Sequence, residues 1–161
     1  MTINVSLNPG AIDAAIKRLE EYAKKVDGLP DTLVKELAAD GARDAQDMAQ
    51  FMDAYDTGEL VGSIRADVQG RSATISANAD HAAYVEFGTG VVGENAPAPH
   101  APIHGWEYDV NSHGEKGWWY VGDDGKRHWT KGMPSRPFMY DTAQMMRQAV
   151  PQRVEEALKK E

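Results

Sequence analysis

The sequence of 161 residues contains no cysteine, which excludes disulfide bridges, thiolate metal sites, iron–sulfur clusters and cysteine nucleophiles. It also lacks a long apolar run, since no stretch approaches the roughly 18 residues that a membrane-spanning helix needs. The first ten residues carry neither a basic nor an apolar stretch, so we expect no secretory signal. From these absences we expect a water-soluble, intracellularly made domain without a membrane role.

Basic residues are in the minority, because 17 Lys and Arg face 25 Asp and Glu, which gives a formal net charge of −8 at pH 7. Phosphate binding depends on Lys and Arg, so we expect no tight binding of nucleic acid. Catalytic motifs are missing as well. There is no G-x-S-x-G nucleophile elbow, and Gly88 and Gly90 are not followed by the Lys-Ser/Thr of a phosphate-binding loop. We therefore expect neither a serine nucleophile nor a phosphate-binding loop.

Apolar periodicity predicts two amphipathic helices at the start of the chain. Apolar residues recur at every third or fourth position along the first one: Ile12, Ile16, Leu19, Ala23 and Val26. Gly28 and Pro30 are expected to end this helix. The second helix is predicted from Asp31 to Met52, and its small residues would let a neighbouring element approach closely: Ala38, Ala39, Gly41, Ala42 and Ala45.

Alternation of apolar and polar residues predicts a β-hairpin in the middle of the chain, with strands at 63–68 and 73–77 and a turn at 69–71. A short apolar element follows at 82–90.

A long insertion is predicted next. Residues 91–117 contain Pro97, Pro99, Pro102 and several glycines, so we expect an irregular loop there. Residues 118–121 and 126–130 are predicted to form a second hairpin, with Trp118 opposite Trp129.

A C-terminal helix is expected from about Pro137, capped by Ser135 or Arg136, and Pro151 would kink it or start a new helix. The predicted fold class is α+β, with an antiparallel sheet packed against long N-terminal and C-terminal helices. We expect one domain over 1–161, with 91–131 as an inserted loop and aromatic hairpin.

Four of the five histidines lie between positions 100 and 128, which raises the hypothesis of a metal site. We favour ordinary loop histidines, because the prolines around His100 and His104 argue against a helix that would present both rings to a metal. Glu86, between Val85 and Phe87, is the one acid placed in an apolar element. It would be a catalytic or metal-binding acid or, as we favour, a helix cap or an ion-pair partner of Arg136.

All four tryptophans lie between positions 106 and 129. Such a cluster is compatible with a small local core, with a subunit contact, or with a platform for a sugar or peptide ligand. The sequence leaves these three interpretations open. Phe138 and Tyr84 are predicted to be anchors in or near the main core.

The order of these pieces resembles the minor tail-component family of siphophage-type virions, whose members are described as neck, head–tail joining or tail-completion proteins. The resemblance rests on two amphipathic helices followed by three motifs. These motifs are Thr57-Gly58-Glu59-Leu60-Val61-Gly62-Ser63-Ile64, then Ala83-Tyr84-Val85-Glu86-Phe87-Gly88-Thr89-Gly90, and finally Arg136-Pro137-Phe138-Met139 before the last helix.

The resemblance implies a structural virion subunit with no catalytic residue, metal or cofactor. It implies a homo-oligomeric ring, with a hexamer suspected, that contacts head-closure or connector proteins and tail proteins around the DNA channel. The protein would reside in the virion and, during assembly, in the host cytoplasm. The structural or interface candidates are Tyr84, Glu86, Phe87, Gly88, Thr89, Trp118, Trp119, Trp129, Arg136, Pro137 and Phe138. The alternatives are a metal-dependent hydrolase using Glu86 and the loop histidines, or a ligand-binding module built on the tryptophans.

Overall fold

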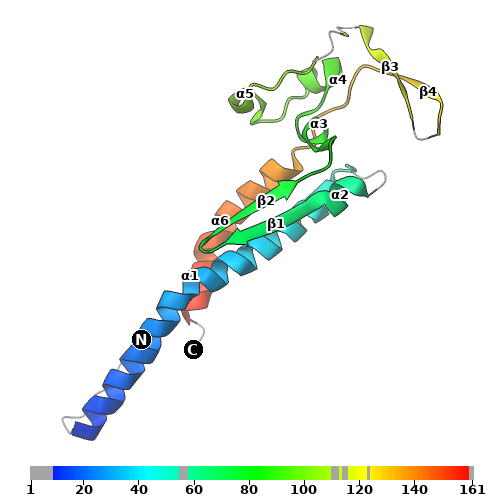
Figure 1. Ribbon diagram of the computed structural model, residues 1–161. Helices are drawn as coiled ribbons and strands as arrows, with labels where there is room; N and C mark the ends of the chain where they lie inside the picture. Colours follow the sequence, from blue (N-terminus) through cyan, green and yellow to red (C-terminus); the bar gives the residue numbers. More distant parts are fainter. Residues whose placement is uncertain (1–8, 55–57, 110–112, 114–115, 123, 160–161) are drawn as a thin grey trace.

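The computed structural model describes residues 9–54, 58–109, 113, 116–122 and 124–159 (Figure 1). The elements in chain order are α1 (Pro9–Phe51), α2 (Glu59–Ser63), β1 (Ile64–Gln69), β2 (Ser72–Ala77), α3 (Ala82–Phe87), α4 (Gly90–Asn95), α5 (Ala101–His104), β3 (Trp118–Val121), β4 (Arg127–Thr130) and α6 (Phe138–Lys159). Both sheets are antiparallel and two-stranded. The predicted α+β class with long N-terminal and C-terminal helices is confirmed.

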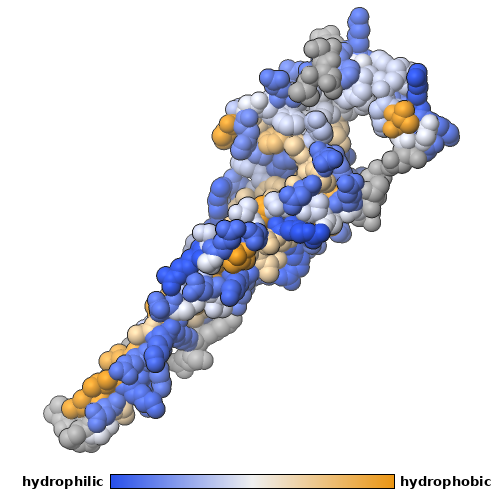
Figure 2. All heavy atoms as spheres, in the orientation of Figure 1, coloured by the Kyte–Doolittle hydropathy of each residue, from blue (hydrophilic) through white to orange (hydrophobic). Residues whose placement is uncertain are grey.

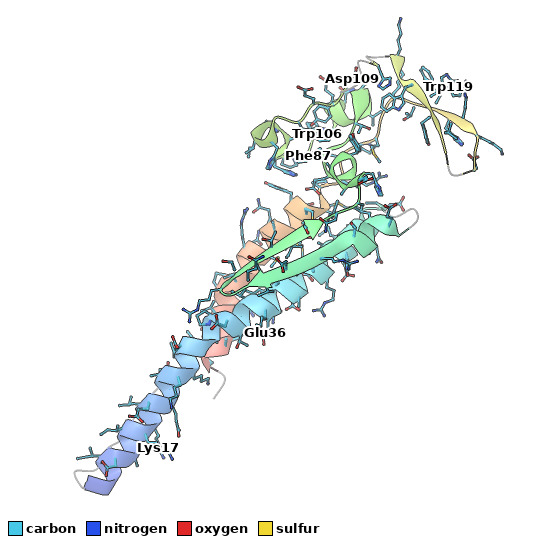
Figure 3. All side chains as sticks on the ribbon, viewed as in Figure 1. Lys17, Glu36, Phe87, Trp106, Asp109 and Trp119 are labelled. Carbon is cyan, nitrogen blue, oxygen red and sulfur yellow. The ribbon has the colours of Figure 1, made fainter. Side chains whose placement is uncertain are left out.

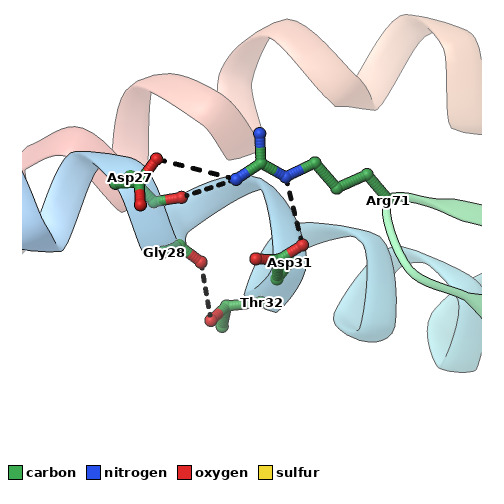
Figure 4. Close-up of polar contacts among 5 residues, drawn as sticks. All are labelled: Asp27, Gly28, Asp31, Thr32 and Arg71. Atoms are coloured by element: carbon green, nitrogen blue, oxygen red, sulfur yellow. Dashed lines mark hydrogen bonds and ion pairs between the residues drawn. The ribbon is translucent and has the colours of Figure 1, made fainter.

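The two predicted N-terminal helices are in fact one, because α1 runs for 43 residues with Pro30 inside it. A proline in a helix removes a backbone donor and costs about 3 kcal/mol, and glycine costs about 1 kcal/mol. Long-range contacts hold the two sides of this weak point together (Figure 4). From the β1–β2 turn, Arg71 Nη2 donates to the main-chain oxygen of Asp27 at 3.1 Å, and its Nε donates to Asp31 Oδ1 at 3.2 Å.

The second half of α1, together with the β1–β2 hairpin and α6, forms what we call the body. Its core cluster consists of Ala45, Ala49, Leu60, Ile64, Ala79, Ala82, Val85 and Phe138. Gly41 shows why small residues were needed on α1. A Cβ at this position would lie 2.3 Å from Met146 Sδ of α6 and 2.6 Å from Ile75 Cδ1 of β2. The close approach predicted from the small residues is therefore confirmed.

The hairpin of the body has the predicted strands, and Gln69 pairs with Ser72 across a two-residue turn. Helix α6 runs back along α1 in the opposite direction and continues through Pro151 (Figure 1). Near its end, Arg153 Nη2 donates to Asp40 Oδ2 of α1 at 2.5 Å.

The loop predicted at 91–117 is wrong in part, because α4 and α5 lie within it. Pro102 falls in the first turn of α5, where a missing N–H costs nothing. The hairpin of β3 and β4 has the predicted strands but a register shifted by one residue. Trp119 faces Trp129 and Trp118 faces Thr130, because β4 begins at Arg127 rather than at Lys126.

The first part of α1 extends beyond both the β1–β2 hairpin and α6 (Figure 1). We call residues 9–26 the N-terminal arm. Apolar side chains lie exposed along one of its faces (Figure 2), and the large ones are 39–51% exposed: Ile12, Ile16, Leu19, Tyr22 and Val26. Among the described helices, none combines the length and the apolar character that crossing a membrane requires.

Candidate functional site

Glu86 is the buried acid of α3, and its carboxylate caps the start of α6. Its two oxygens accept hydrogen bonds from the backbone N–H groups of Met139 at 2.9 Å and Tyr140 at 3.0 Å. These are the donors that a Ser, Thr or Asp preceding a helix ordinarily satisfies. Here Pro137 precedes the helix and its carbonyl accepts from Asp141, but its ring offers no acceptor. The expected capping role of Glu86 is confirmed.

The expected cap by Ser135 or Arg136 is wrong, because both residues serve other parts of the chain. Ser135 Oγ donates to the carbonyl of Ala96 at 2.7 Å, and the Arg136 N–H donates to the carbonyl of Val85 at 2.8 Å. These bonds tie the segment before α6 to α3 and α4. They place Phe138 in the core, where its side chain is fully buried as predicted.

His100, rather than Arg136, is the titratable partner of Glu86 within the described residues. Its Nε2 lies 3.1 Å from Glu86 Oε1, and its ring stacks on Tyr140 with a centroid distance of 4.6 Å. The ring also contacts Phe87, at a centroid distance of 4.8 Å. Three elements therefore meet at this histidine: α3, the start of α5 and the first turn of α6.

Burial shifts the pKa values of both Glu86 and His100. Burial raises the pKa of the Glu86 carboxyl above its ordinary value, and the two backbone donors oppose that rise. Burial also lowers the pKa of the His100 imidazole, with His104 acting in the same direction. The lowered pKa of His100 favours a neutral imidazole, which donates its Nε2 hydrogen to Glu86 Oε1. Its Nδ1 is then buried without a hydrogen-bond partner among the residues that the structure describes.

His100 and His104 lie nearer to each other than the sequence suggested, because α5 places both rings on one short turn. Their centroids are 5.6 Å apart. Even so, the described part of the chain contains no group of three or more His, Asp or Glu side chains arranged to hold a metal ion. Both oxygens of Glu86 are engaged by backbone donors, so its carboxylate serves the fold.

Aromatic residues join α3 to the segment after α5. Phe87 stacks on Trp106 with centroids 4.8 Å apart, and Trp106 Nε1 donates to the carbonyl of Gly88 at 3.0 Å (Figure 3). Tyr84 contacts the edge of the same indole at 5.8 Å. However, Tyr84 is 43% exposed, so its predicted place in or near the core is wrong. It faces outward because α3 is a helix whose buried side carries Val85 and Glu86.

Thr89 anchors the segment before α6 to the end of α3. It forms an isolated β-bridge with Met133, in which each N–H donates to the other carbonyl, at 3.0 and 3.1 Å. The backbones are so close that a Cβ at Gly132 would lie 1.8 Å from the carbonyl oxygen of Thr89. The φ angle of Gly132, 102°, also favours glycine.

The four tryptophans do not form one cluster. Trp106 packs on Phe87, as described above. Trp118 stacks on His113 with centroids 4.7 Å apart and lines a pocket. Trp119 and Trp129 form an edge-to-face pair on the β3–β4 hairpin and are 60% and 48% exposed. Figure 3 labels Trp119 on this hairpin, away from the body. A small local core, a subunit contact and a ligand platform were the three interpretations of the tryptophans, and each would concern different residues.

The pocket has a volume of about 600 Å³ and lies between α3, the β3–β4 hairpin and the segment before α6. About half of the residues that line it have aromatic rings: His81, Tyr84, Tyr108, His113, Trp118 and Tyr120. The hydroxyl of Tyr108 is buried without a hydrogen-bond partner among the described residues. Sequence reasoning missed Tyr108 because nothing in its local pattern distinguishes it.

Sequence reasoning also missed His100 as the partner of Glu86. One signal could have suggested a distant cap. The motif before α6 offers Pro137 where a capping side chain is usual, so an acceptor had to come from elsewhere in the chain.

Residues 13–88 match the sequence model of the HK97-gp10-like family, described as "Bacteriophage HK97-gp10, putative tail-component". The match includes most of the N-terminal arm, the hairpin of the body and α3 with Glu86. The resemblance predicted from the sequence is therefore confirmed over this part of the chain. The matched residues make up a little under half of the chain, and the family is described as a tail component of a bacteriophage. Neither the curated proteins nor the solved structures contain a match to this chain.

Proposed function

We propose that the protein is a neck subunit that joins or completes the tail at the head–tail interface, around the channel through which DNA passes. The observation that carries the proposal is the family match over residues 13–88, combined with the coupling between its motifs. Glu86, inside the matched region, caps α6, which begins within the third motif, Arg136-Pro137-Phe138-Met139. The matched motif and the later one thus work as one structural unit.

In this role the protein would form a homo-oligomeric ring in the virion, with six copies suspected from the family resemblance. Its partners would be head-closure or connector proteins on one side and tail proteins on the other, met first in the host cytoplasm. The chain would act as one domain, with 91–131 as an insertion whose exposed Trp119 and Trp129 suit a contact with a partner.

The acidic composition supports a channel that does not hold DNA. Each copy carries a formal charge of −8, and tight binding of DNA would need several Lys or Arg contacts to phosphates. We expect no binding of duplex DNA between about 50 and 200 mM salt, the range over which phosphate contacts weaken steeply. Micromolar binding that falls with salt would contradict this part of the proposal.

The direct test is a phage in which this gene is deleted. A neck subunit predicts DNA-filled heads and separate, otherwise complete tails, with joining restored when the gene is supplied in trans. Normal joining of heads and tails in the deletion would overturn the proposal. The variant Glu86→Ala, supplied in trans, should fail to restore joining, whereas Glu21→Ala, at an exposed position of the arm, should restore it.

The pocket supports a second candidate function, a ligand-binding module. Its wall of aromatic side chains and its unpartnered Tyr108 hydroxyl are features of sites for small molecules or peptides. Titration with sugars and short peptides, followed by tryptophan fluorescence, would test it. Saturable quenching that is lost in Trp118→Ala but kept in Trp119→Ala would favour the module. A metal-dependent hydrolase is disfavoured, because both oxygens of Glu86 are engaged at the start of α6.

A further inference from the structure

The β3–β4 hairpin has one face that looks toward the pocket and one that looks outward. Side chains alternate between the two faces of a strand, so the register of the hairpin divides its residues into two sets. The inward set lines the pocket: Trp118, Tyr120 and Thr130. The outward set contains Arg127 and three apolar side chains, Trp119, Val121 and Trp129, which are 60%, 67% and 48% exposed. Exposed apolar side chains gathered on one face are typical of a contact with another protein.

The hairpin segment 116–132 is basic, in contrast to the rest of the chain. It contains four Lys or Arg and two Asp, a formal charge of +2, whereas the other residues sum to −10. Its basic side chains are exposed and have no ion-pair partner among the described residues: Lys116, Lys126, Arg127 and Lys131. Asp124, at the turn, lies 2.9 Å from His128 Nε2. Charge complementarity therefore favours an acidic partner for this face.

The end of α1 offers a complementary surface. Residues 31–53 contain six Asp or Glu and only two Lys or Arg. Asp44, Asp47 and Phe51 follow one another at spacings of three and four residues, so they lie on one side of the helix. The ring of Phe51 is 86% exposed, although it ends a helix whose opposite side is buried in the body. We call these three residues the α1 end surface.

Arginines near this half of α1 are engaged by other residues. Arg43 and Arg153 both bind Asp40, and Arg147 Nη1 donates to Gln144 Oε1 at 3.4 Å. Within the part of the chain that the structure describes, no ion pair neutralises either aspartate of the α1 end surface. The surface thus combines an exposed ring with two unpaired acids.

Both surfaces lie at the same end of the molecule. In Figure 1 the β3–β4 hairpin and the end of α1, beside α2, lie opposite to the N-terminal arm along the long axis. Copies that stand side by side with parallel long axes can therefore bring the hairpin of one against the α1 end surface of the next. Such a contact joins two different surfaces, and heterologous contacts of this kind continue from copy to copy until a ring closes.

We propose that the outward face of the β3–β4 hairpin binds the α1 end surface of a neighbouring copy of this chain. The proposal rests on the oligomer of the proposed function and names one contact that builds it. Trp119 and Trp129 form the apolar centre of the contact against the neighbour's Phe51. The basic side chains of the hairpin surround this centre and face the two aspartates, which gives the apolar core and charged rim usual in protein interfaces.

The absence of native cysteine allows a direct test with two populations of full-length protein. One population carries Val121→Cys on the hairpin and the other carries Gln50→Cys beside Phe51, and a tag distinguishes their masses. They are mixed at high concentration and treated with a short bismaleimide. We expect covalent heterodimers from this pair. In the control, Glu21→Cys on the N-terminal arm replaces Gln50→Cys and gives only the background of random collisions.

Charge reversal tests the electrostatic part of the contact. Arg127→Glu in the hairpin population should lower the yield of heterodimer about threefold or more, because attraction to the aspartates becomes repulsion. Asp44→Lys with Asp47→Lys in the other population should then restore the yield. Arg18→Glu changes the net charge equally but lies on the arm, and it should alter the yield by less than about twofold.

Truncation of an aromatic side chain tests the apolar centre. Trp129→Ala should lower the yield about tenfold or more, because aromatic residues at the centre of an interface carry much of the binding free energy. The matched control is Ile103→Ala, at a residue of α5 that is 82% exposed, and it should change the yield by less than about twofold. Circular dichroism and melting temperatures verify that each variant keeps the parent fold.

The outcomes separate this contact from the proposed function. The contact is overturned by a yield no higher than in the Glu21→Cys control, or by homodimers of Val121→Cys in place of heterodimers. A loss in Arg127→Glu that reversal of the aspartates does not restore would also overturn it. If the contact failed while heads and tails stayed unjoined without the gene, the neck function would stand. Heterodimers with all the expected responses, together with normal joining in the deletion, would keep the contact and refute the neck function.

Discussion

The two halves of α1 share one helical face but treat it in opposite ways. In the body, the face is covered by β1, β2 and α6, and Ala38, Ala45 and Ala49 are buried on it. In the N-terminal arm, the same periodicity continues through larger residues, yet Ile16 and Leu19 are about half exposed. The half with the smaller side chains is the half with the packed core.

This difference teaches that residue size on a helical face indicates how close its partner lies. Alanine and glycine on the body half let neighbours of the same chain approach closely, as the contacts at Gly41 show. The isoleucines and leucine of the arm keep large parts of their side chains exposed. The same apolar periodicity thus carries a packed core in one half of α1 and an exposed face in the other.

The largest expected effect comes from the body core. Phe138→Ala should lower the free energy of unfolding by about 3–5 kcal/mol, because the side chain is fully buried among residues of α1 and α3. The matched variant Phe51→Ala should change it by less than about 0.5 kcal/mol, since this ring is 86% exposed. Denaturant melts measure both values. A loss below about 1 kcal/mol in Phe138→Ala would indicate that this ring serves contacts between molecules instead.

The same substitution in the two regions sharpens the comparison. Ile64→Ala, at a side chain that is 1% exposed, should cost about 2–4 kcal/mol in the dilute protein. Ile16→Ala, in the arm, should cost less than about 0.5 kcal/mol under the same conditions. Denaturant melts measure both losses. Equal losses in dilute protein would break the distinction between arm and body.

Two further substitutions compare a glutamate of the body region with a glutamate of the arm. Glu86→Gln should cost about 1–2 kcal/mol, because its amide NH₂ would face one of the two N–H groups at the start of α6 and leave that donor unsatisfied. Glu21→Gln, at an exposed position of the arm, should have almost no effect. Urea melts at pH 7 provide the measurement. A cost for Glu86→Gln no larger than that for Glu21→Gln would argue against the cap.

The smallest expected effect is an increase in stability rather than a loss. Gly28→Ala should increase the helicity of the arm and stabilise it by up to about 1 kcal/mol, since a Cβ there would meet no atom within 4 Å. Gly41→Val should instead destabilise the body by about 1–3 kcal/mol, because Met146 and Ile75 occupy the space. Far-ultraviolet circular dichroism and melts distinguish the two. Destabilisation in both variants would show that the arm is packed against the chain itself.

Much of the fold was predictable from local patterns. The β1–β2 strands and their turn, the apolar face of Asp31 to Met52 and the burial of Phe138 all followed from periodicity and turn residues. The register of the β3–β4 hairpin was missed by one residue, because the pattern does not fix where its loop ends.

The remaining features depend on contacts between distant residues. Gly28 and Pro30 were expected to end a helix, but α1 continues through both residues. No local signal reveals that Arg71, 40 residues after Asp31, contacts α1 on both sides of them. Likewise Glu86 was recognised as a placed acid, whereas its partners His100, Met139 and Tyr140 come from separate elements. Local sequence therefore located the candidate residues but not the contacts that explain them.

Hydrogen exchange along α1, followed in dilute protein, tests most directly whether the two halves of α1 differ in their packing. In dilute protein we expect strong protection of residues 31–51 and rapid exchange in residues 9–26, because an isolated helical stretch of this length is marginal in water. Uniform protection of the whole helix in dilute protein would contradict the account.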